Sequence, residues 1–258
     1  MNSLFYQRKL LRISIASAWL MALAVLMSFT CGTSASSGEK IRSFPSEGLG
    51  IKNGYGTLVY QNNFDTKESL VSDQLGEGTV STTIFKDGTG SFRSFVSGAA
   101  RTSEGYRSEQ QYSDPLYNPD EVVVEYDCYF EKWKNFEHNN GHVVQWHPNT
   151  AGASATLAIY AFTGKFQVVR NINDTNFYQP DTLKTIIPDT WYKIRFEVKW
   201  SKDNNGYVKV FIDNMLYYSF TGRTADDNGT PYFKLGQNRW NVSESSTVYY
   251  DNLKIYKK

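Results

Sequence analysis

Residues 193–200 read Lys-Ile-Arg-Phe-Glu-Val-Lys-Trp, and charged and apolar side chains alternate along the whole stretch. Because successive side chains of a β-strand point to opposite faces of a sheet, this alternation predicts a strand with one buried and one solvated face. A turn rich in Asn and Gly follows at Ser201–Gly206, and a second strand-like run occupies Val208–Ile212. The region therefore predicts an antiparallel β-hairpin.

Strand-like patterns recur along most of the chain, and no segment from Leu58 onward carries a sustained helical period. Further strands are predicted at Leu58–Asn63, Val80–Phe85, Ser91–Val96, Tyr106–Gln111, Val122–Phe130, Leu157–Ala161, Lys165–Arg170, Tyr217–Thr221, Tyr232–Leu235 and Val248–Tyr256. Many short strands separated by Gly, Asn and Asp turns predict an all-β fold, namely a single jelly-roll sandwich of the concanavalin A or lectin-like type. Most large aromatic residues are expected in its core.

The N-terminal region has the composition of a secretory signal peptide. Residues 1–12 are polar and basic, residues 13–30 are apolar and uncharged, and Cys31 opens a run of small residues. We expect residues 1–30 to be the signal peptide, 31–52 a Ser/Gly-rich tether and 53–258 one folded domain. Cys31 is a candidate lipidation site, which would make the protein a periplasmic or cell-surface lipoprotein; without lipidation the protein would be secreted.

Charge and cysteine content narrow the function classes. The leader holds three of the 27 Lys and Arg residues and none of the 26 Asp and Glu residues, so the remainder carries a formal charge of −2. No basic patch suited to many phosphates is evident, which argues against nucleic acid as a partner. The other cysteine, Cys128, lies in an apolar run and has no pairing partner, so we expect no disulfide. The domain is expected to be a monomer.

The stretch Gly141–Pro148 reads Gly-His-Val-Val-Gln-Trp-His-Pro and contains an amide and an imidazole two residues apart. A regular strand would place Val143, Gln145 and His147 on one face, and His142, Val144 and Trp146 on the other. Gln145 could then hydrogen-bond a carboxylate while His147 moves a proton. A structural interpretation is also open, in which His147 caps the strand end and Gln145 faces solvent.

Two further motifs carry polar side chains on one strand face. In Tyr106-Arg107-Ser108-Glu109 the guanidinium of Arg107 can grip a carboxylate, although an Arg/Glu pair at this spacing is also common as a solvated surface pair. In residues 232–240, Tyr-Phe-Lys-Leu-Gly-Gln-Asn-Arg-Trp, one face would present Tyr232, Lys234, Asn238 and Trp240. Gly236 is expected to leave room for a substrate near the backbone.

In this order and with these separations, the Arg-Ser-Glu, Gln-X-His and Tyr-Phe-Lys-X-Gly motifs resemble those of the jelly-roll polysaccharide lyases. That group includes the alginate lyases of family 7 and the glucuronan lyase and heparin lyase I groups. The resemblance extends over roughly Phe64 to Tyr256. It implies a concave sheet that binds an acidic polysaccharide (alginate, glucuronan, ulvan or a glycosaminoglycan). It also implies cleavage of a 1,4-linkage to a uronate by β-elimination, which leaves an unsaturated uronate end.

The resemblance also implies roles for the site residues. Arg107, Gln145 and Asn238 would stabilise the charge that develops on the uronate carboxylate, and His147 would remove the C5 proton. In the family a tyrosine two residues after the motif glycine handles the proton of the leaving group, and here Asn238 occupies that position. Another phenol must then donate, and the candidates are Tyr160, Tyr178 and Tyr232. Substrate contacts are expected from these tyrosines and from Glu109, Lys234, Asn238 and Trp240.

Several alternatives and secondary expectations accompany this interpretation. A non-catalytic glycan-binding protein on the same fold stays open, because Asn238 has no titratable proton. A glycoside hydrolase would need two facing carboxylates, and no such pair is evident. Tyr178 lies in a polar segment, Asn171–Pro180, that could act as a lid. His138 and His142 are backup candidates for the base, although each is expected to be a surface or structural histidine. Asp65 and Asp251 could meet at a structural Ca²⁺, but about six to eight oxygen ligands are needed, so we predict no cofactor and no metal site.

Overall fold

The computed structural model describes residues 54–71, 75–76, 78–98, 106–133, 141–149, 153–179, 184–227, 230–239 and 244–258. All of them belong to one compact unit, Phe44–Lys258. The expected signal peptide, the tether and Cys31 lie outside the described residues, as do His138 and Trp240. No helix in the described ranges is long and apolar enough to cross a membrane.

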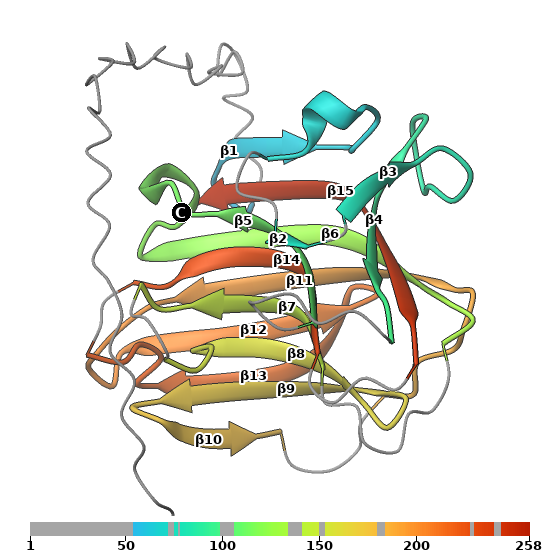
Figure 1. The fold of residues 1–258 in the computed structure, drawn as a ribbon. Helices are drawn as coiled ribbons and strands as arrows, with labels where there is room; N and C mark the ends of the chain where they lie inside the picture. The colour runs from blue at the N-terminus through green and yellow to red at the C-terminus, as the bar shows by residue number, and fades with distance from the viewer. Residues whose placement is uncertain are drawn as a thin grey trace, which may run out of the picture. The chain divides into compact units, whose positions relative to one another are not determined.

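The described chain is built from β-strands, with two short 3₁₀ turns and no α-helix (Figure 1). The strands are β1 (Thr57–Asn62), β2 (Leu75–Gly76), β3 (Gly78–Ser81), β4 (Ser91–Val96), β5 (Tyr106–Tyr112), β6 (Glu121–Glu131), β7 (Gly141–His147), β8 (Leu157–Phe162), β9 (Lys165–Ile172), β10 (Thr175–Tyr178), β11 (Trp191–Lys199), β12 (Gly206–Ile212), β13 (Met215–Gly222), β14 (Tyr232–Arg239) and β15 (Ser246–Lys257). The 3₁₀ turns are η1 (Lys67–Ser69) and η2 (Pro115–Tyr117).

The strands form two antiparallel sheets. One has the order β13-β12-β11-β6-β15-β4-β3, with β1 also paired to β15, and the other has the order β10-β9-β8-β7-β14-β5-β2. Contacts between the two sheets form the core. The ring centroid of Trp146 on β7 lies 4.6 Å from that of Phe196 on β11. The hydroxyl of Tyr250 on β15 donates a hydrogen bond to the carbonyl oxygen of Val143 on β7. The prediction of an all-β jelly-roll sandwich is confirmed.

The stretch that predicted the fold lies inside the first sheet, between β12 and β6. In β11, Ile194, Phe196 and Val198 are fully buried in the core, while the charged residues between them lie on the outer face. The predicted hairpin with β12 is present, with Ile194 paired to Ile212. The alternation holds because one face of the strand packs against the opposite sheet along its length. The outer face is only partly solvated, since Arg195 is buried there against the rings of Tyr55 and Phe211.

Two segments differ from the sequence-based expectation. The strand predicted to end at Phe85 ends at Ser81, and a loop follows it. The segment expected to be a lid contains instead the edge strand β10, which pairs with β9 through Tyr178 and Val169. The turn between these strands is made by Asn173 and Asp174, with φ angles of 48° and 61°. Asn and Asp tolerate this left-handed conformation, which suits a tight hairpin turn.

Candidate active site

The sheet that contains β14 brings the three sequence motifs together. On one side of β14, Asn238 pairs with Arg107 and Gly236 pairs with Glu109 of β5. On the other side, Lys234 pairs with Gln145 of β7, and Tyr232 pairs with His147. Directly paired residues project to the same face of a sheet. The expectation that Arg107, Gln145, His147 and Lys234 share one face is therefore met, and we call this surface the site face.

A β-bulge in β7 changes the side-chain pattern that a regular strand would give. His142 pairs with Tyr160 of β8, but Val144 pairs with Ile159, so Val143 is an extra residue in β7. Both valines are buried in the core. The bulge turns His142 onto the site face, contrary to the prediction that it shares a face with Val144 and Trp146. Two consecutive apolar residues inside an otherwise alternating strand are the sequence signal for this bulge.

His142 is a buried neutral imidazole on the site face. Its ring centroid lies 4.5 Å from that of Tyr160. Burial lowers the pKa of His142 to about 3, and the positive charges of Lys234, Arg107 and the protonated form of His147 add to this effect. These groups act on one another although they come from three strands, so their side chains form one electrostatic cluster.

Glu109 and Gln145 form a buried hydrogen-bonded pair. Gln145 Nε2 donates to Glu109 Oε1 over 2.5 Å. Gln145 is 1% exposed and Glu109 is 0% exposed. The interpretation of Gln145 as a solvated outward residue is therefore wrong. Glu109, which was expected to contact the substrate, contacts Gln145.

His147 has the protonation state of a base. Its Nδ1 lies 2.8 Å from the carbonyl oxygen of Pro148, and because a carbonyl only accepts, Nδ1 carries the proton and Nε2 carries the lone pair. Burial lowers the pKa of His147, as do the charges of Lys234 and Arg107, while hydrogen bonds to the backbone of Pro148 and Ala153 act in the opposite direction. The ring is thus neutral at neutral pH.

The three candidate phenols lie at different distances from this imidazole. The ring centroid of Tyr232 is 5.8 Å from that of His147, and the ammonium of Lys234 lies 5.3 Å from the centre of the Tyr232 ring. Burial raises the pKa of Tyr232, and it raises that of Tyr160 to about 12. Tyr178 is 54% exposed on β10, two strands beyond β8. The phenols of Tyr232 and Tyr160 therefore keep their protons at neutral pH.

Gly236 has a structural role that differs from the expected one. Its φ angle is +133°, and a Cβ atom there would lie 2.2 Å from the carbonyl oxygen of Ser108. The adjacent backbone of β5, and not the approach of a substrate, accounts for the glycine.

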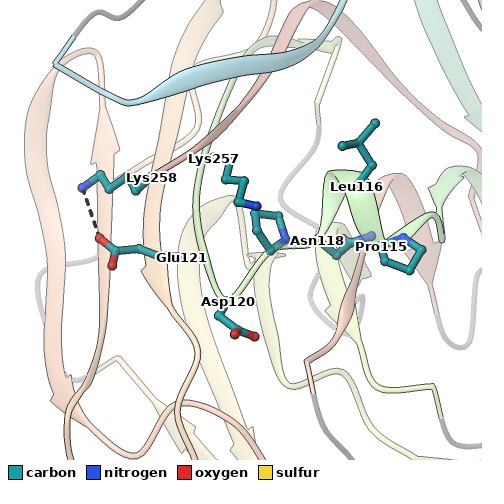
Figure 2. A pocket seen from close by; sticks show the side chains of 8 residues that line it. Pro115, Leu116, Asn118, Asp120, Glu121, Lys257 and Lys258 are labelled. Atoms are coloured by element: carbon teal, nitrogen blue, oxygen red, sulfur yellow. Dashed lines mark ion pairs between the residues drawn. The ribbon is translucent and has the colours of Figure 1, made fainter. Parts of the chain in front are cut away.

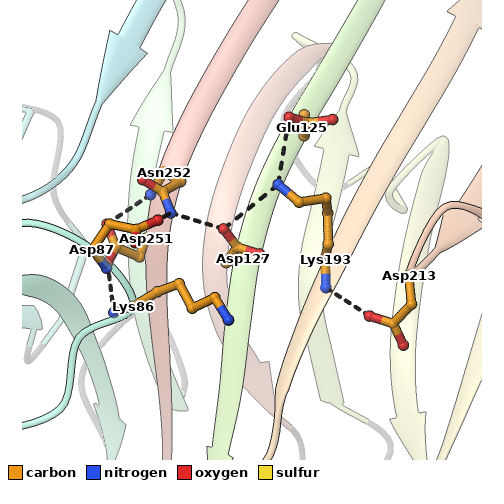
Figure 3. A network of polar contacts seen from close by, with 8 residues as sticks. All are labelled: Lys86, Asp87, Glu125, Asp127, Lys193, Asp213, Asp251 and Asn252. Carbon is orange, nitrogen blue, oxygen red and sulfur yellow. Dashed lines mark hydrogen bonds and ion pairs between the residues drawn. The ribbon is translucent and has the colours of Figure 1, made fainter.

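Asp65 and Asp251, the two carboxylates considered for calcium, accept hydrogen bonds from the backbone of the loop after β3. Asp251 Oδ2 accepts from the backbone N–H groups of Lys86 and Asp87 over 2.8 and 3.0 Å (Figure 3). Asp65 Oδ1 accepts from the N–H groups of Thr89 and Gly90 over 2.6 and 3.1 Å. Within the described ranges, no group of three or more His, Cys, Asp or Glu side chains is arranged to bind a metal ion.

One cavity of about 430 Å³ lies away from the site face (Figure 2). It is lined by Pro115, Leu116, Asn118, Pro119, Asp120, Glu121, Lys257 and Lys258. None of the residues of the three motifs lines it, so the cavity and the candidate active site are different places.

A jelly roll whose sheet face combines cationic side chains with a neutral histidine has the features of a protein that acts on acidic carbohydrates. The sequence matches the family described as polysaccharide lyase over residues 49–254, so the chain belongs to that family. A comparison with curated proteins found no match.

Solved structures of polysaccharide lyases share the fold. One is an endo-β-1,4-glucuronan lyase from the fungus Trichoderma reesei, with a TM-score of 0.64 and 16% identity, covering 78% of this chain and 96% of that one. Another is an alginate lyase from Aplysia kurodai, with a TM-score of 0.55 and 15% identity, covering 79% and 100%. A third, an alginate lyase from a Chlorella virus, has a TM-score of 0.53 and 13% identity, covering 70% and 90%. The resemblance to jelly-roll polysaccharide lyases is confirmed.

Proposed function

We propose that this chain is an exported lyase that cleaves a 1,4-linked, uronate-containing polysaccharide by β-elimination. The observation that carries the proposal is the cluster on the site face, where the neutral imidazole of His147 lies within the field of Arg107 and Lys234. Similarity to lyases named for glucuronan and alginate supports a polyuronate as the substrate class. Export, with or without a lipid at Cys31, is proposed from the N-terminal sequence alone.

The proposed reaction assigns a separate task to each of several groups on the site face. Arg107 and Asn238 donate hydrogen bonds to the C6 carboxylate of the uronate, and Gln145 adds its second Nε2 hydrogen, which makes the C5 proton more acidic. His147 Nε2 removes that proton. The electron pair of the C5–H bond forms the C4=C5 double bond, the C4–O4 bond breaks, and O4 leaves with a proton from a phenol.

Tyr232 is the proposed proton donor. Its ring is the phenol in contact with His147, and it lies in the field of Glu109 and Arg107. Tyr160, which lies against His142, is the alternative donor. Tyr178 is more distant, so its proposed role is a contact with the outer part of the glycan.

The first test is a screen of alginate, glucuronan, ulvan and unsulfated glycosaminoglycans for the ultraviolet absorbance of the unsaturated product. On the polymer that is cleaved, His147→Ala should lower kcat roughly 100- to 10,000-fold and leave binding largely intact, because a general base acts mainly in the transition state. Gln167→Leu, on the same face two strands away from Gln145, is the matched control. Unchanged turnover in His147→Ala would reassign the base.

The second test concerns the proton donor. Tyr232→Phe should abolish most turnover with little loss of binding, while Tyr178→Phe should keep kcat. Loss of turnover in Tyr160→Phe instead would move the donor to β8. Full activity in all three phenylalanine variants would contradict a tyrosine donor.

The second candidate function is a glycan-binding protein without catalysis. Asn238 favours it, because an amide cannot transfer the proton that a tyrosine would supply at this position. Binding of a polyuronate with no unsaturated product in any polymer of the screen would establish this function instead.

A further inference from the structure

The hydrogen bond between Glu109 and Gln145 links two strands that are not neighbours. Glu109 lies on β5 and Gln145 on β7, and β14 runs between them. Gln145 Nε2 nevertheless donates to Glu109 Oε1 over 2.5 Å, and both side chains are at most 1% exposed. A contact this short between fully buried groups holds the amide in one place.

The carboxylate also determines which end of the amide faces it. A carboxylate only accepts hydrogen bonds, so an amide rotated by half a turn would place two acceptor oxygens together. Nε2 must therefore face Glu109, and Oε1 faces away from it. Gln145 Oε1 is buried and makes no hydrogen bond to any residue in the described ranges.

A buried acceptor without a donor costs free energy, so a bound ligand that brings a donor gains affinity there. A uronate carboxylate is itself an acceptor and cannot be that donor. The hydroxyl groups of a sugar ring can donate this hydrogen bond. Arg107 Nε is the opposite case, a buried donor without a hydrogen-bond partner in the described chain, and it suits the carboxylate of the same sugar.

On the basis of the proposed function, we infer that Glu109 is a positioning residue that orients Gln145, and that Gln145 Oε1 accepts a hydrogen bond from a free hydroxyl of the bound uronate. The site therefore selects polyuronates that are unsubstituted at this hydroxyl. An O-acetyl or O-sulfate group removes the donor and adds bulk, and a sulfate also places negative charge near Glu109.

For the hydroxyl to reach Gln145 Oε1, a covering side chain must move, and we assign this movement to Lys234. The oxygen is covered in the structure, and Lys234 lies directly opposite Gln145 on β14. A lysine side chain has a long flexible stem, so it can swing aside as the carboxylate of the sugar approaches its ammonium.

The test compares the cleaved polymer with the same polymer after chemical O-acetylation. For the wild type, kcat/KM should be roughly 10- to 100-fold lower on the acetylated polymer, because a site that binds a hydroxyl leaves its acceptor unpaired with the ester. Glu109→Gln preserves shape but allows either end of Gln145 to face residue 109. This variant should lose activity on the free polymer and should discriminate less between the two polymers. Gln167→Leu should keep the wild-type ratio.

The outcomes separate this inference from the lyase proposal. Equal cleavage of both polymers by the wild type, or an unchanged ratio in a Glu109→Gln variant that melts like the wild type, overturns the inference while the lyase activity stands. If Glu109→Gln does not fold, the wild-type ratio alone decides. If no polymer is cleaved, the lyase proposal fails, and calorimetric binding of alginate and O-acetylated alginate tests the inference by itself, with equal affinities overturning it.

Discussion

At the scale of single residues, burial first and nearby charges second keep the ring of His147 neutral. Lys234 and Arg107 both disfavour an imidazolium, in addition to the effect of burial. The same two cations are suited to hold an anionic sugar, so in the proposed reaction one arrangement would both bind the substrate and keep the base unprotonated.

The first prediction at this scale concerns pH. Since the pKa of His147 is lowered from 6.5, the ring stays neutral to lower pH than a free histidine, and activity should fall only as the pH drops below that value. Lys234→Met removes one positive charge, so it should raise the pKa of His147 and move the acidic limb of kcat/KM to higher pH. An NMR titration of the His147 ring measures the shift directly.

Lys209→Met is the control, because Lys209 is an exposed residue of β12 in the other sheet. This variant should leave the titration unchanged. A His147 pKa that stays constant in Lys234→Met would contradict the charge coupling.

At the scale of elements, the irregularities of two neighbouring strands shape the site. The bulge at Val143 turns His142 onto the site face, and β14 shifts its register with β7 between Leu235 and Asn238. Gly236 lies inside that shift with its positive φ. A bulge of this kind re-aims side chains without interrupting the sheet.

The prediction for this scale compares two glycines. Gly236→Ala should lower the free energy of unfolding by roughly 2–3 kcal/mol, because alanine disfavours positive φ and its Cβ would meet the backbone of β5. Gly54→Ala should change it little, since a Cβ atom at Gly54 would have no other atom within 4 Å. Denaturant unfolding of the two variants measures the difference. Equal stability would mean that β14 can shift away from β5 at no cost.

At the scale of the whole molecule, the chain is nearly neutral, while the site face carries the cationic side chains of Arg107 and Lys234. The formal net charge of the full sequence is only +1. Under the proposed function, attraction of an acidic polymer would therefore depend on the local cations Arg107 and Lys234.

The corresponding prediction concerns salt. The Debye length falls from about 10 Å at 0.1 M salt to about 3 Å at 1 M, so KM for a polyuronate should rise over this range while kcat changes less. Lys234→Met should reduce the dependence of KM on salt. Lys202→Met, in the exposed turn between β11 and β12, should not reduce it. A KM independent of salt would contradict electrostatic capture of the substrate.

The sequence alone determined the features that depend on local periodicity. Alternation in residues 193–200 predicted a half-buried strand, and the period of two placed Arg107 with Glu109 and Gln145 with His147. These predictions hold because the direction of a side chain in a regular strand follows from backbone geometry. The order of the three motifs also indicated the family, since each motif is read directly from the chain.

Only the tertiary structure decided which strands are neighbours and where they deviate from regularity. The pairing of Glu109 with Gln145 requires β5 and β7 to flank β14, and His142 reaches the site face only through a bulge. The strand β10 depends on its pairing with β9. Asp65 and Asp251 accept hydrogen bonds from the backbone of a loop that is distant from Asp251 in the sequence, and the residues around each Asp do not indicate this contact. Register, bulges and buried polar pairs are set by packing between distant segments, and this is why local pattern could not predict them.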